Sequence, residues 1–264
     1  MKSRFIVTAG MLLLSTAMSA FAQQNAEHGG TPTWRLGVGA ISKTSVYAGE
    51  DSDIKAVPLL NYESDTFFFR AISGGYHLLD QDGLKLDATL GLRLNGVNKE
   101  DFGVAELAAK GINRNLLEDR DNGLDLGIAA SFSGHMGEVE LALKMDVSGA
   151  SKGFEASAKY GYPIQFGATS ITPNVSISHY SKKFANYYYG TLDAEVDRGV
   201  VNYKPGSTVI PSIGVAVRRP FADNWMLMGN LSYSALPSRI TDSPIVDKDT
   251  SGVTSVFFGI SRGF

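Results

Sequence analysis

Apolar residues alternate with polar or small residues along much of the chain, with a period of two. In LKLDATLGLRL, residues 84–94, every second position is Leu or Ala, while Lys, Asp, Thr, Gly and Arg fill the positions between them. Side chains of a β-strand point alternately to its two faces, so this stretch predicts a strand with one apolar and one polar face.

The same alternation recurs often enough to predict an all-β fold. Strands that cross a bilayer at a tilt have about 10 residues, whereas soluble strands average five or six. Most of the candidate segments have the longer length. The eleven candidates are residues 34–40, 57–62, 67–79, 84–94, 124–132, 139–147, 154–162, 171–180, 209–218, 225–236 and 253–264.

The connections between these segments fall into two length classes. Tight turns occupy residues 80–83, 135–137, 167–169 and 220–224, whereas residues 95–122, 182–207 and 237–251 are long. Short periplasmic turns and longer extracellular loops are typical of an antiparallel transmembrane β-barrel of the outer membrane. Aromatic residues near the strand ends suit the two interfacial girdles of such a barrel. They are Trp34, Tyr62, Tyr76, Tyr160, Tyr162, Trp225 and Tyr233.

The barrel interpretation places the leucine face of residues 84–94 on lipid, and Lys85, Asp87 and Arg93 on a polar lumen. Single-chain bacterial barrels have an even number of strands, so eleven candidates indicate ten or twelve strands. Either residues 57–62 and 67–79 do not each cross the membrane, or a strand lies within 95–122 or 182–207. A soluble secreted sandwich is the alternative, because its strands alternate too.

The N-terminus has the features of an export signal. Lys2 and Arg4 precede an apolar run that ends in Ala-Phe-Ala at positions 20–22. This pattern predicts a cleaved signal peptide over residues 1–22, with cleavage before Gln23. Residues 23–264 would then form the barrel in the outer membrane of a Gram-negative cell.

Composition narrows the function classes. The chain has 24 Lys and Arg against 27 Asp and Glu, and the mature net charge without Lys2 and Arg4 is −5. No basic stripe is present to displace counterions, so nucleic acid is not an expected partner. Cysteine is absent, which excludes disulfides, thiolate metal sites and thiol nucleophiles. We expect no cofactor and no metal.

Two motifs suggest chemistry without completing it. Asp119, Asp121, Gly123 and Asp125 resemble a calcium loop, but the glycine comes one place early and the twelfth position is Ala130, not Glu. We interpret this segment as a solvated acidic loop, with weak cation bridging to lipopolysaccharide as the alternative.

The second motif is SHYS, residues 178–181, which places His179 and Ser181 two residues apart on one strand face. That spacing resembles the His-x-Ser arrangement of outer-membrane lipid A deacylases. The alternative is an interfacial polar residue at a strand end. No matching acid is identifiable, and we predict a protein without enzymatic activity.

Two loop segments are candidate interaction sites. Three consecutive tyrosines followed by glycine offer rigid contact area with hydrogen-bonding tips, although their rings could instead join a girdle or fold back over the lumen. In the last long loop, an apolar pair among polar neighbours indicates packing on the barrel mouth or on a partner. The candidates are Tyr187, Tyr188, Tyr189 and Gly190, and Asp242, Ser243, Pro244 and Val246. The terminal Phe264 resembles the signal that outer-membrane proteins present to the barrel-assembly machinery.

Several segments together, in this order, resemble the MipA/OmpV family of outer-membrane proteins. They are residues 46–62, 65–78, 170–177, 186–190, 224–236 and 240–248. The resemblance implies a barrel without known catalysis that acts as a scaffold, bringing the lytic transglycosylase MltA together with a bifunctional penicillin-binding protein. Other members are linked to adhesion, osmotic response or antibiotic entry. Residues 95–122 resemble the family least, so the function of that loop stays open.

Three hypotheses follow. The first is a scaffold whose periplasmic rim or loops bind murein enzymes, in a barrel that contacts outer-membrane lipid and lipopolysaccharide. The second is a narrow channel, since charged residues of both signs alternate onto the lumen face; the same charges could instead pair and fill the lumen. The third is the deacylase, the most remote of the three.

Overall fold

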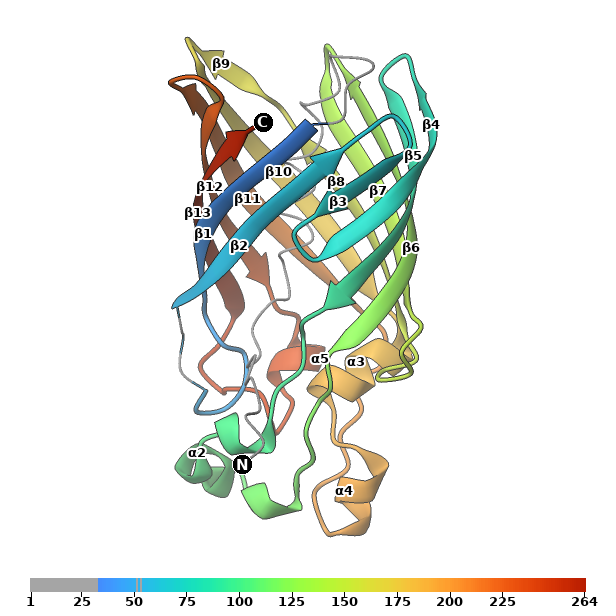
Figure 1. Ribbon diagram of the computed structural model, residues 1–264. Coiled ribbons are helices and arrows are strands. Elements are labelled where there is room, and N and C mark those ends of the chain that lie inside the picture. Colours follow the sequence, from blue (N-terminus) through green and yellow to red (C-terminus); the bar gives the residue numbers. More distant parts are fainter. Residues whose placement is uncertain (1–32, 51, 53) are drawn as a thin grey trace, which may run out of the picture.

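The computed structural model describes residues 33–50, 52 and 54–264 and shows an antiparallel β-barrel with short helices gathered at one end (Figure 1). The strands are β1 (Thr33–Lys43), β2 (Ile54–Glu63), β3 (Phe67–Arg70), β4 (Ser73–Gln81), β5 (Leu84–Arg93), β6 (Gly123–Gly134), β7 (Gly137–Asp146), β8 (Phe154–Gly161), β9 (Ile164–Phe166), β10 (Thr169–Tyr180), β11 (Thr208–Phe221), β12 (Trp225–Ala235) and β13 (Gly252–Gly263). The α-helices are α2 (Val104–Ala109), α3 (Lys182–Tyr189), α4 (Asp193–Asp197) and α5 (Ser238–Thr241), and the 3-10 turns are η2 (Lys99–Asp101) and η3 (Arg114–Leu116).

The barrel closes with twelve strands. β8 and β9 both pair with β10, in one continuous register that is interrupted only around Pro163, so they count as one strand of the wall. β1 pairs with β13, and β10 pairs with β11, so the hydrogen-bonded sheet has no free end. The predicted barrel is confirmed, and of the two predicted strand counts twelve is the one observed.

The additional strand lies in the segment that was predicted to be one strand, residues 67–79. The chain turns at Ala71 and Ile72, so that β3 and β4 form a hairpin in which Arg70 pairs with Ser73. Ala71 has a positive φ of 53°, as tight turns between antiparallel strands require. The proposed hidden strand within 95–122 or 182–207 is wrong, because the described structure of those segments is helical or irregular.

Residues 84–94 turn their apolar side chains outward and their charged side chains toward the lumen, as predicted. Leu90 and Leu92 are exposed on the outer surface of β5, whereas Asp87 and Arg93 are buried inside the barrel. Aromatic rings stand on the outer surface near the strand ends, and Trp34 lies 4.7 Å from Tyr62 between ring centroids. An apolar outer face and a polar inner face are the reverse of a soluble sandwich, whose apolar side chains face inward.

The two ends of the barrel differ. The short-turn rim carries the β4–β5, β6–β7, β9–β10 and β11–β12 turns and the C-terminus, at the top of Figure 1, while the helices and long loops lie at the bottom. No helix among the described residues is long and apolar enough to cross a membrane. The predicted signal peptide, residues 1–22, lies outside the described part of the chain.

Candidate functional site

An ion-pair network inside the barrel joins the wall to the long-loop end. The Arg93 guanidinium contacts the Asp125 carboxylate at 2.5 Å and the Glu155 carboxylate at 2.9 Å. Its Cζ also lies 4.5 Å from the centre of the Phe184 ring, which belongs to α3. A charge buried at this depth is retained only when it is paired, and Arg93 is paired with two carboxylates from different strands.

A second network lies nearer to the short-turn rim. The His77 ring is held between two carboxylates, with Nδ1 2.7 Å from Asp87 Oδ1 and Nε2 3.2 Å from Glu63 Oε1. Arg70 also contacts Glu63, at 2.9 Å. Two of the lumen charges that the sequence indicated therefore have partners: Asp87 contacts His77, and Arg93 contacts two carboxylates. Lys85 pairs with Asp80 at 2.9 Å.

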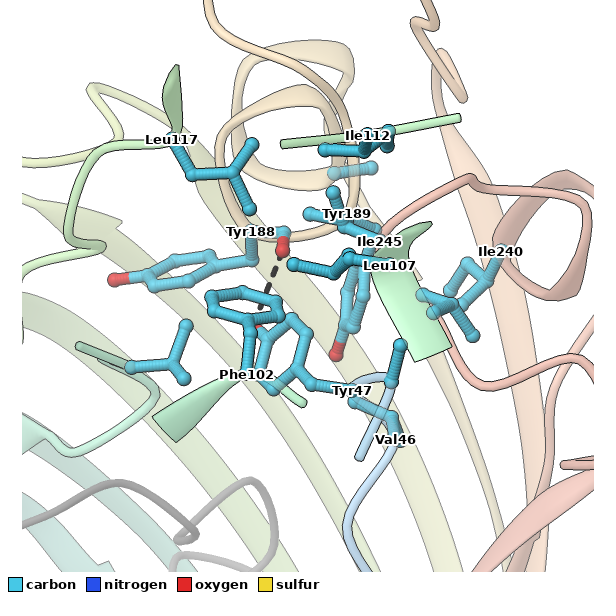
Figure 2. Packing of buried hydrophobic residues seen from close by; sticks show 14 of the residues in the cluster. Val46, Tyr47, Phe102, Leu107, Ile112, Leu117, Tyr188, Tyr189, Ile240 and Ile245 are labelled. Atoms are coloured by element: carbon cyan, nitrogen blue, oxygen red, sulfur yellow. Dashed lines mark hydrogen bonds between the residues drawn. The ribbon is translucent and has the colours of Figure 1, made fainter. Parts of the chain in front are cut away.

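The long loops meet in one apolar core, which we call the loop cap, formed by residues 44–50, 94–122, 181–207 and 236–251 (Figure 2). The core includes the ends of three strands. Its buried members are Val46, Tyr47, Ala48, Val97, Phe102, Leu107, Ile112, Leu117, Tyr180, Phe184, Ala185, Tyr188, Tyr189, Val200, Ile210, Ile240, Ile245, Val246 and Val253. Burial on this scale stabilises the loops by about 1.5–3 kcal/mol for each large apolar side chain, before the cost of ordering them.

Tyr47 connects three of the loops of the cap. Its hydroxyl donates to the Tyr188 carbonyl at 3.0 Å, and its ring packs edge-on against Phe102 at 5.3 Å between centroids. The next residue, Ala48, donates its N–H to the Ile245 carbonyl at 3.0 Å. Burial raises the pKa of the Tyr47 and Tyr188 phenols well above the ordinary tyrosine value, so both hydroxyls keep their protons.

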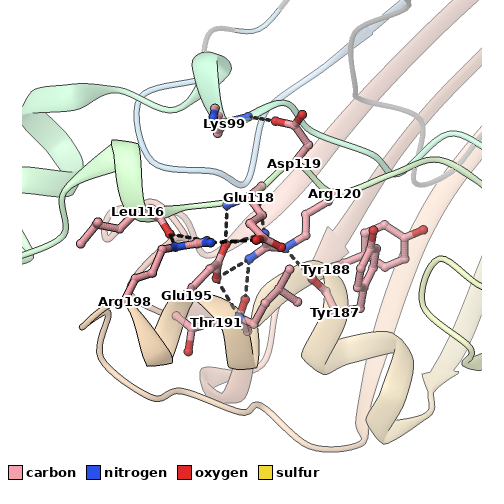
Figure 3. A network of polar contacts seen from close by, with 12 residues as sticks. Lys99, Leu116, Glu118, Asp119, Arg120, Tyr187, Tyr188, Thr191, Glu195 and Arg198 are labelled. Carbon is pink, nitrogen blue, oxygen red and sulfur yellow. Dashed lines mark hydrogen bonds and ion pairs between the residues drawn. The ribbon is translucent and has the colours of Figure 1, made fainter.

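A buried ion pair joins the loop of residues 94–122 to the loop of residues 181–207 (Figure 3). Arg120 and Glu195 contact each other through two parallel bonds of 2.7 and 3.0 Å, and both side chains have 0% exposure. The other Arg120 donors bind the carbonyls of Tyr187, Glu118 and Gly190 at 2.7 to 3.1 Å. Glu195 accepts the N–H groups of Glu118 and Leu192 at 2.8 and 2.7 Å. Every donor of the guanidinium is therefore used, which is the condition for a buried pair to be tolerated.

The predicted tyrosine site lies within this cap. Tyr188 and Tyr189 are buried in the apolar core, and Tyr187 is half-buried with its hydroxyl accepting the Asp121 N–H at 2.8 Å. The segment is helical, ending at Gly190, and its rings fold over the barrel mouth, which was the alternative left open. Only Tyr187 keeps a surface that a partner could contact in this conformation.

The second predicted loop site is divided between core and surface. Ser243 and Val246 are buried, Pro244 is half-buried, and Asp242 is exposed. Val246 forms an isolated β-bridge with Tyr47, so the apolar part of this loop packs on the barrel mouth. An interaction role for this loop stays a prediction, with Asp242 as its accessible member.

SHYS has a structural role. The Ser181 hydroxyl accepts the N–H of Phe184 at 3.4 Å and the N–H of Phe154 at 2.9 Å, so it caps the start of α3 and fastens it to β8. The His179 ring lies 5.9 Å from the Phe154 ring on the outer surface. The serine oxygen is thus committed to backbone donors, an arrangement that a nucleophile activated by His179 would have to give up.

We expect Ser181→Ala to destabilise the α3 end of the cap by about 1 kcal/mol, because an N-cap side chain is lost. The variant should be cleaved faster by a protease within residues 181–207, while the mass spectrum of lipid A in cells that produce it matches that of the unmodified protein. A lipid A species that disappears only in Ser181→Ala cells would restore the deacylase hypothesis.

The acidic segment 119–125 is distributed over separate contacts. Asp119 accepts the Lys99 N–H at 2.8 Å, and Asp125 lies inside the barrel on Arg93. In the described part of the chain, no group of three or more His, Asp or Glu side chains is placed to hold a metal ion.

The short-turn rim exposes large apolar side chains. Met136 in the β6–β7 turn is 84% exposed, and Phe166 at the end of β9 is 62% exposed. Tyr160 donates its hydroxyl to the Met136 carbonyl at 2.6 Å, which connects the β6–β7 turn to β8. The terminal Phe264 is also exposed, and its N–H donates to the Trp34 carbonyl at 2.9 Å. Phe264 stays a predicted assembly signal.

A closed antiparallel barrel with an apolar outer face, ion-paired interior and folded long loops defines an outer-membrane β-barrel protein. The family model described as "MltA-interacting protein MipA" matches residues 36–264. The chain belongs to this family.

Three relatives show the range of names within the family. The "Putative outer membrane protein YiaT" of Escherichia coli K12 is 29% identical over 220 residues, which cover 82% of this chain and 85% of that one. The "MltA-interacting protein" of the same strain is 27% identical over 260 residues and 98% of both chains. "Outer membrane protein OmpV" of Vibrio cholerae is 26% identical over 81% of this chain and 80% of its own. The outer membrane is the location of this protein.

Proposed function

We propose that this protein is a non-enzymatic scaffold that holds murein-processing enzymes at the periplasmic face of the outer membrane. The partner class is a lytic transglycosylase, joined by a penicillin-binding protein. Support for the partner comes from the relative named MltA-interacting protein, which matches nearly the whole chain. Murein enzymes work in the periplasm, so the binding surface would be the rim that carries the short turns.

The observation that carries the proposal is the exposed apolar surface on that rim. Met136 lies in the β6–β7 turn and Phe166 lies at the end of β9. β7 and β8, which pair with each other, connect the β6–β7 turn to the segment that ends at Phe166. All three residues of β9, which pairs with β10, are exposed. Large apolar side chains on a polar rim are typical of a protein-binding surface.

The interior favours a scaffold over a channel. Opposite charges inside the barrel pair across strands, as Arg93 does with Asp125 and Glu155, and such pairs fill a narrow lumen. The loop cap packs its apolar core over the opposite mouth. Both features support a barrel whose surfaces, not its lumen, perform the function.

The test is capture of a purified lytic transglycosylase of the MltA type by the immobilised, detergent-solubilised protein at physiological salt. We expect the paired substitution Met136→Ser and Phe166→Ser to weaken capture about tenfold, because hot-spot side chains contribute more than about 1 kcal/mol each. The matched control is Val104→Ser with Val201→Ser, two exposed residues of the loop cap, which should leave capture unchanged. No capture by the unmodified protein, or an equal loss in the control, would contradict the proposal.

A further inference from the structure

The hydrogen-bonded wall is interrupted between β2 and β5. The β3–β4 hairpin fills this place only as far as its turn at Ala71 and Ile72, where Ala71 donates to the Leu60 carbonyl at 2.8 Å and Leu92 donates to the Ile72 carbonyl at 3.0 Å. Beyond that turn, toward the loop cap, residues 54–59 of β2 pair with β1 but with no strand on their other edge in the described structure. We call this place the notch.

At the notch, β2 and β5 are too far apart to form backbone hydrogen bonds with each other. β2 and β5 flank a two-stranded hairpin, so their axes are three interstrand spacings apart, roughly 14 Å, where the hairpin ends. Figure 1 shows the lower part of β2 and the end of β5 diverging below the hairpin. The two sides of the notch are therefore strand edges that do not reach each other by backbone hydrogen bonds.

The notch lies at a depth where the wall faces lipid. The register places Ala56 beside Ala40 and Pro58 beside Val38, and Val38 belongs to the exposed apolar outer face. An unpaired strand edge at this depth is costly, because hydrocarbon offers no hydrogen bonds. The Leu60 carbonyl points toward β3, so the backbone groups of Pro58, two residues earlier, point into the notch, and a proline has no N–H to leave unpaired there.

Apolar side chains gather in the lumen behind the notch, where Lys55 of β2 lies beside Ile41 in the β1–β2 register. Ile41, Leu59, Met228 and Phe257 form a buried cluster there. The hairpin turn belongs to the same contact, because Ala71 packs against this cluster together with Val57 and Met226.

Glycines make room for this cluster. A Cβ at Gly259 would lie 2.8 Å from both Leu59 Cδ1 and Phe257 Cζ, so a glycine is needed for these two side chains to meet over β13. The outer lip of the notch is apolar as well, since Ile54 is 78% exposed and Ala56 and Pro58 are exposed beside it. Apolar residues thus stand on both faces of β2 beside the notch, and the inner residues there, apart from Lys55, belong to the buried cluster or pack against it.

We propose that the notch admits an acyl chain of an outer-membrane lipid to the apolar cluster inside the barrel. The acyl chain is hydrocarbon, and the notch faces the hydrocarbon region of the bilayer. The side chains that the acyl chain would contact in the cluster are apolar as well. Among the described strands, the notch is the interruption of backbone pairing that lies beside this cluster. The proposal does not depend on transglycosylase binding, and either can fail without the other.

The test uses fluorescence quenching by lipids whose acyl chains carry bromine. The native tryptophans are first replaced by Trp34→Phe and Trp225→Phe, and a single tryptophan is then placed behind the notch by Val57→Trp. A matched variant, Ser176→Trp, places the tryptophan inside the barrel behind β10, which is paired on both sides at that residue. Val38→Trp on the lipid face is the reference for full contact.

We expect quenching of the Val57→Trp variant to lie within about twofold of the Val38→Trp reference, and that of Ser176→Trp to stay near zero, because strand pairing in the described wall is interrupted at the notch and complete on both sides of residue 176. No quenching at position 57, or equal quenching at positions 57 and 176, would overturn the proposal. Each variant is first checked for a boiling-dependent shift on a gel, and Met226→Trp, beside the same cluster, replaces Val57→Trp if the latter does not fold.

Discussion

Replacing Glu195 with Ala is expected to open the loop cap while leaving the barrel wall intact. The substitution leaves the Arg120 guanidinium buried with 0% exposure and without its carboxylate. Removing one partner of a buried pair costs about 3–5 kcal/mol, because the remaining charge has lost its compensation. The cost falls on the contact between residues 94–122 and 181–207, since Arg120 and Glu195 come from these two loops.

Protease cleavage within the cap measures this opening. When opening is fast relative to cleavage, the cleavage rate follows the population of the open form, so we expect an increase of about 100-fold or more in Glu195→Ala. The boiling-dependent gel shift should persist, because the strand ladders do not include either residue. The matched control is Asp193→Ala, which removes an exposed pair with Lys204 at 2.7 Å in the same loop and should leave the rate unchanged.

A double apolar replacement distinguishes the ion pair from the network around it. In many proteins an apolar pair of similar volume substitutes well for a buried salt bridge. Here Arg120 also binds three carbonyls and Glu195 two N–H groups, and Arg120→Met with Glu195→Leu would leave them without these partners. We therefore expect the double variant to remain protease-sensitive. A cap as resistant as that of the unmodified protein would show that the backbone contacts contribute little.

The barrel itself was accessible from sequence because a period of two is a local property. Each lipid-facing strand has apolar residues at alternate positions, as at Leu90 and Leu92, and this alternation does not depend on which strand lies beside it. The short strand β9 lay outside the predicted segments, and the β3–β4 hairpin was predicted as one strand. Its turn uses Ala71 and Ile72 where an Asn-Gly or Asp-Gly pair would have signalled two strands, and aromatic residues on both faces obscured the alternation.

The loop cap was not accessible in the same way. Arg120 and Glu195 are 75 residues apart, and the local sequence around each residue does not predict that the two form an ion pair. Helix α3 did carry a signal, since Ser181 stands at its N-cap and Gly190 follows its last residue. The same Ser181 was considered as a nucleophile, because the motif His-x-Ser does not distinguish a serine that caps a helix from one that attacks a carbonyl.

The notch shows what pattern analysis misses even where it succeeds. Pro58 interrupts an otherwise ordinary strand, and a proline in a strand indicates an edge. The edge was not predicted because the neighbouring strand appeared complete when residues 67–79 were taken as one segment. The edge of β2 follows from the hairpin, because β3 is too short to pair with the part of β2 that contains Pro58.

Leu90→Arg is expected to destabilise the barrel by about 2–4 kcal/mol in lipid, because it places a charge on the lipid-facing surface near the middle of a strand. Leu90 is 47% exposed and lies beside Leu126 across the β5–β6 pair, so its side chain has no water to reach without distorting the wall. Unfolding by urea in lipid vesicles gives the free energy of unfolding for both proteins.

The neighbouring residue provides the control, since Thr89→Arg places the same charge on the opposite face of the same strand. Position 89 faces the lumen, where the barrel already holds the carboxylates of Asp87 and Asp125, so we expect a smaller cost than at position 90. In detergent micelles, whose surface water is close to the wall, the difference between the two variants should shrink. Equal costs at positions 89 and 90 in vesicles would contradict a lipid-facing leucine surface on β5, and a larger cost at position 89 would mean that the two faces of the wall are reversed.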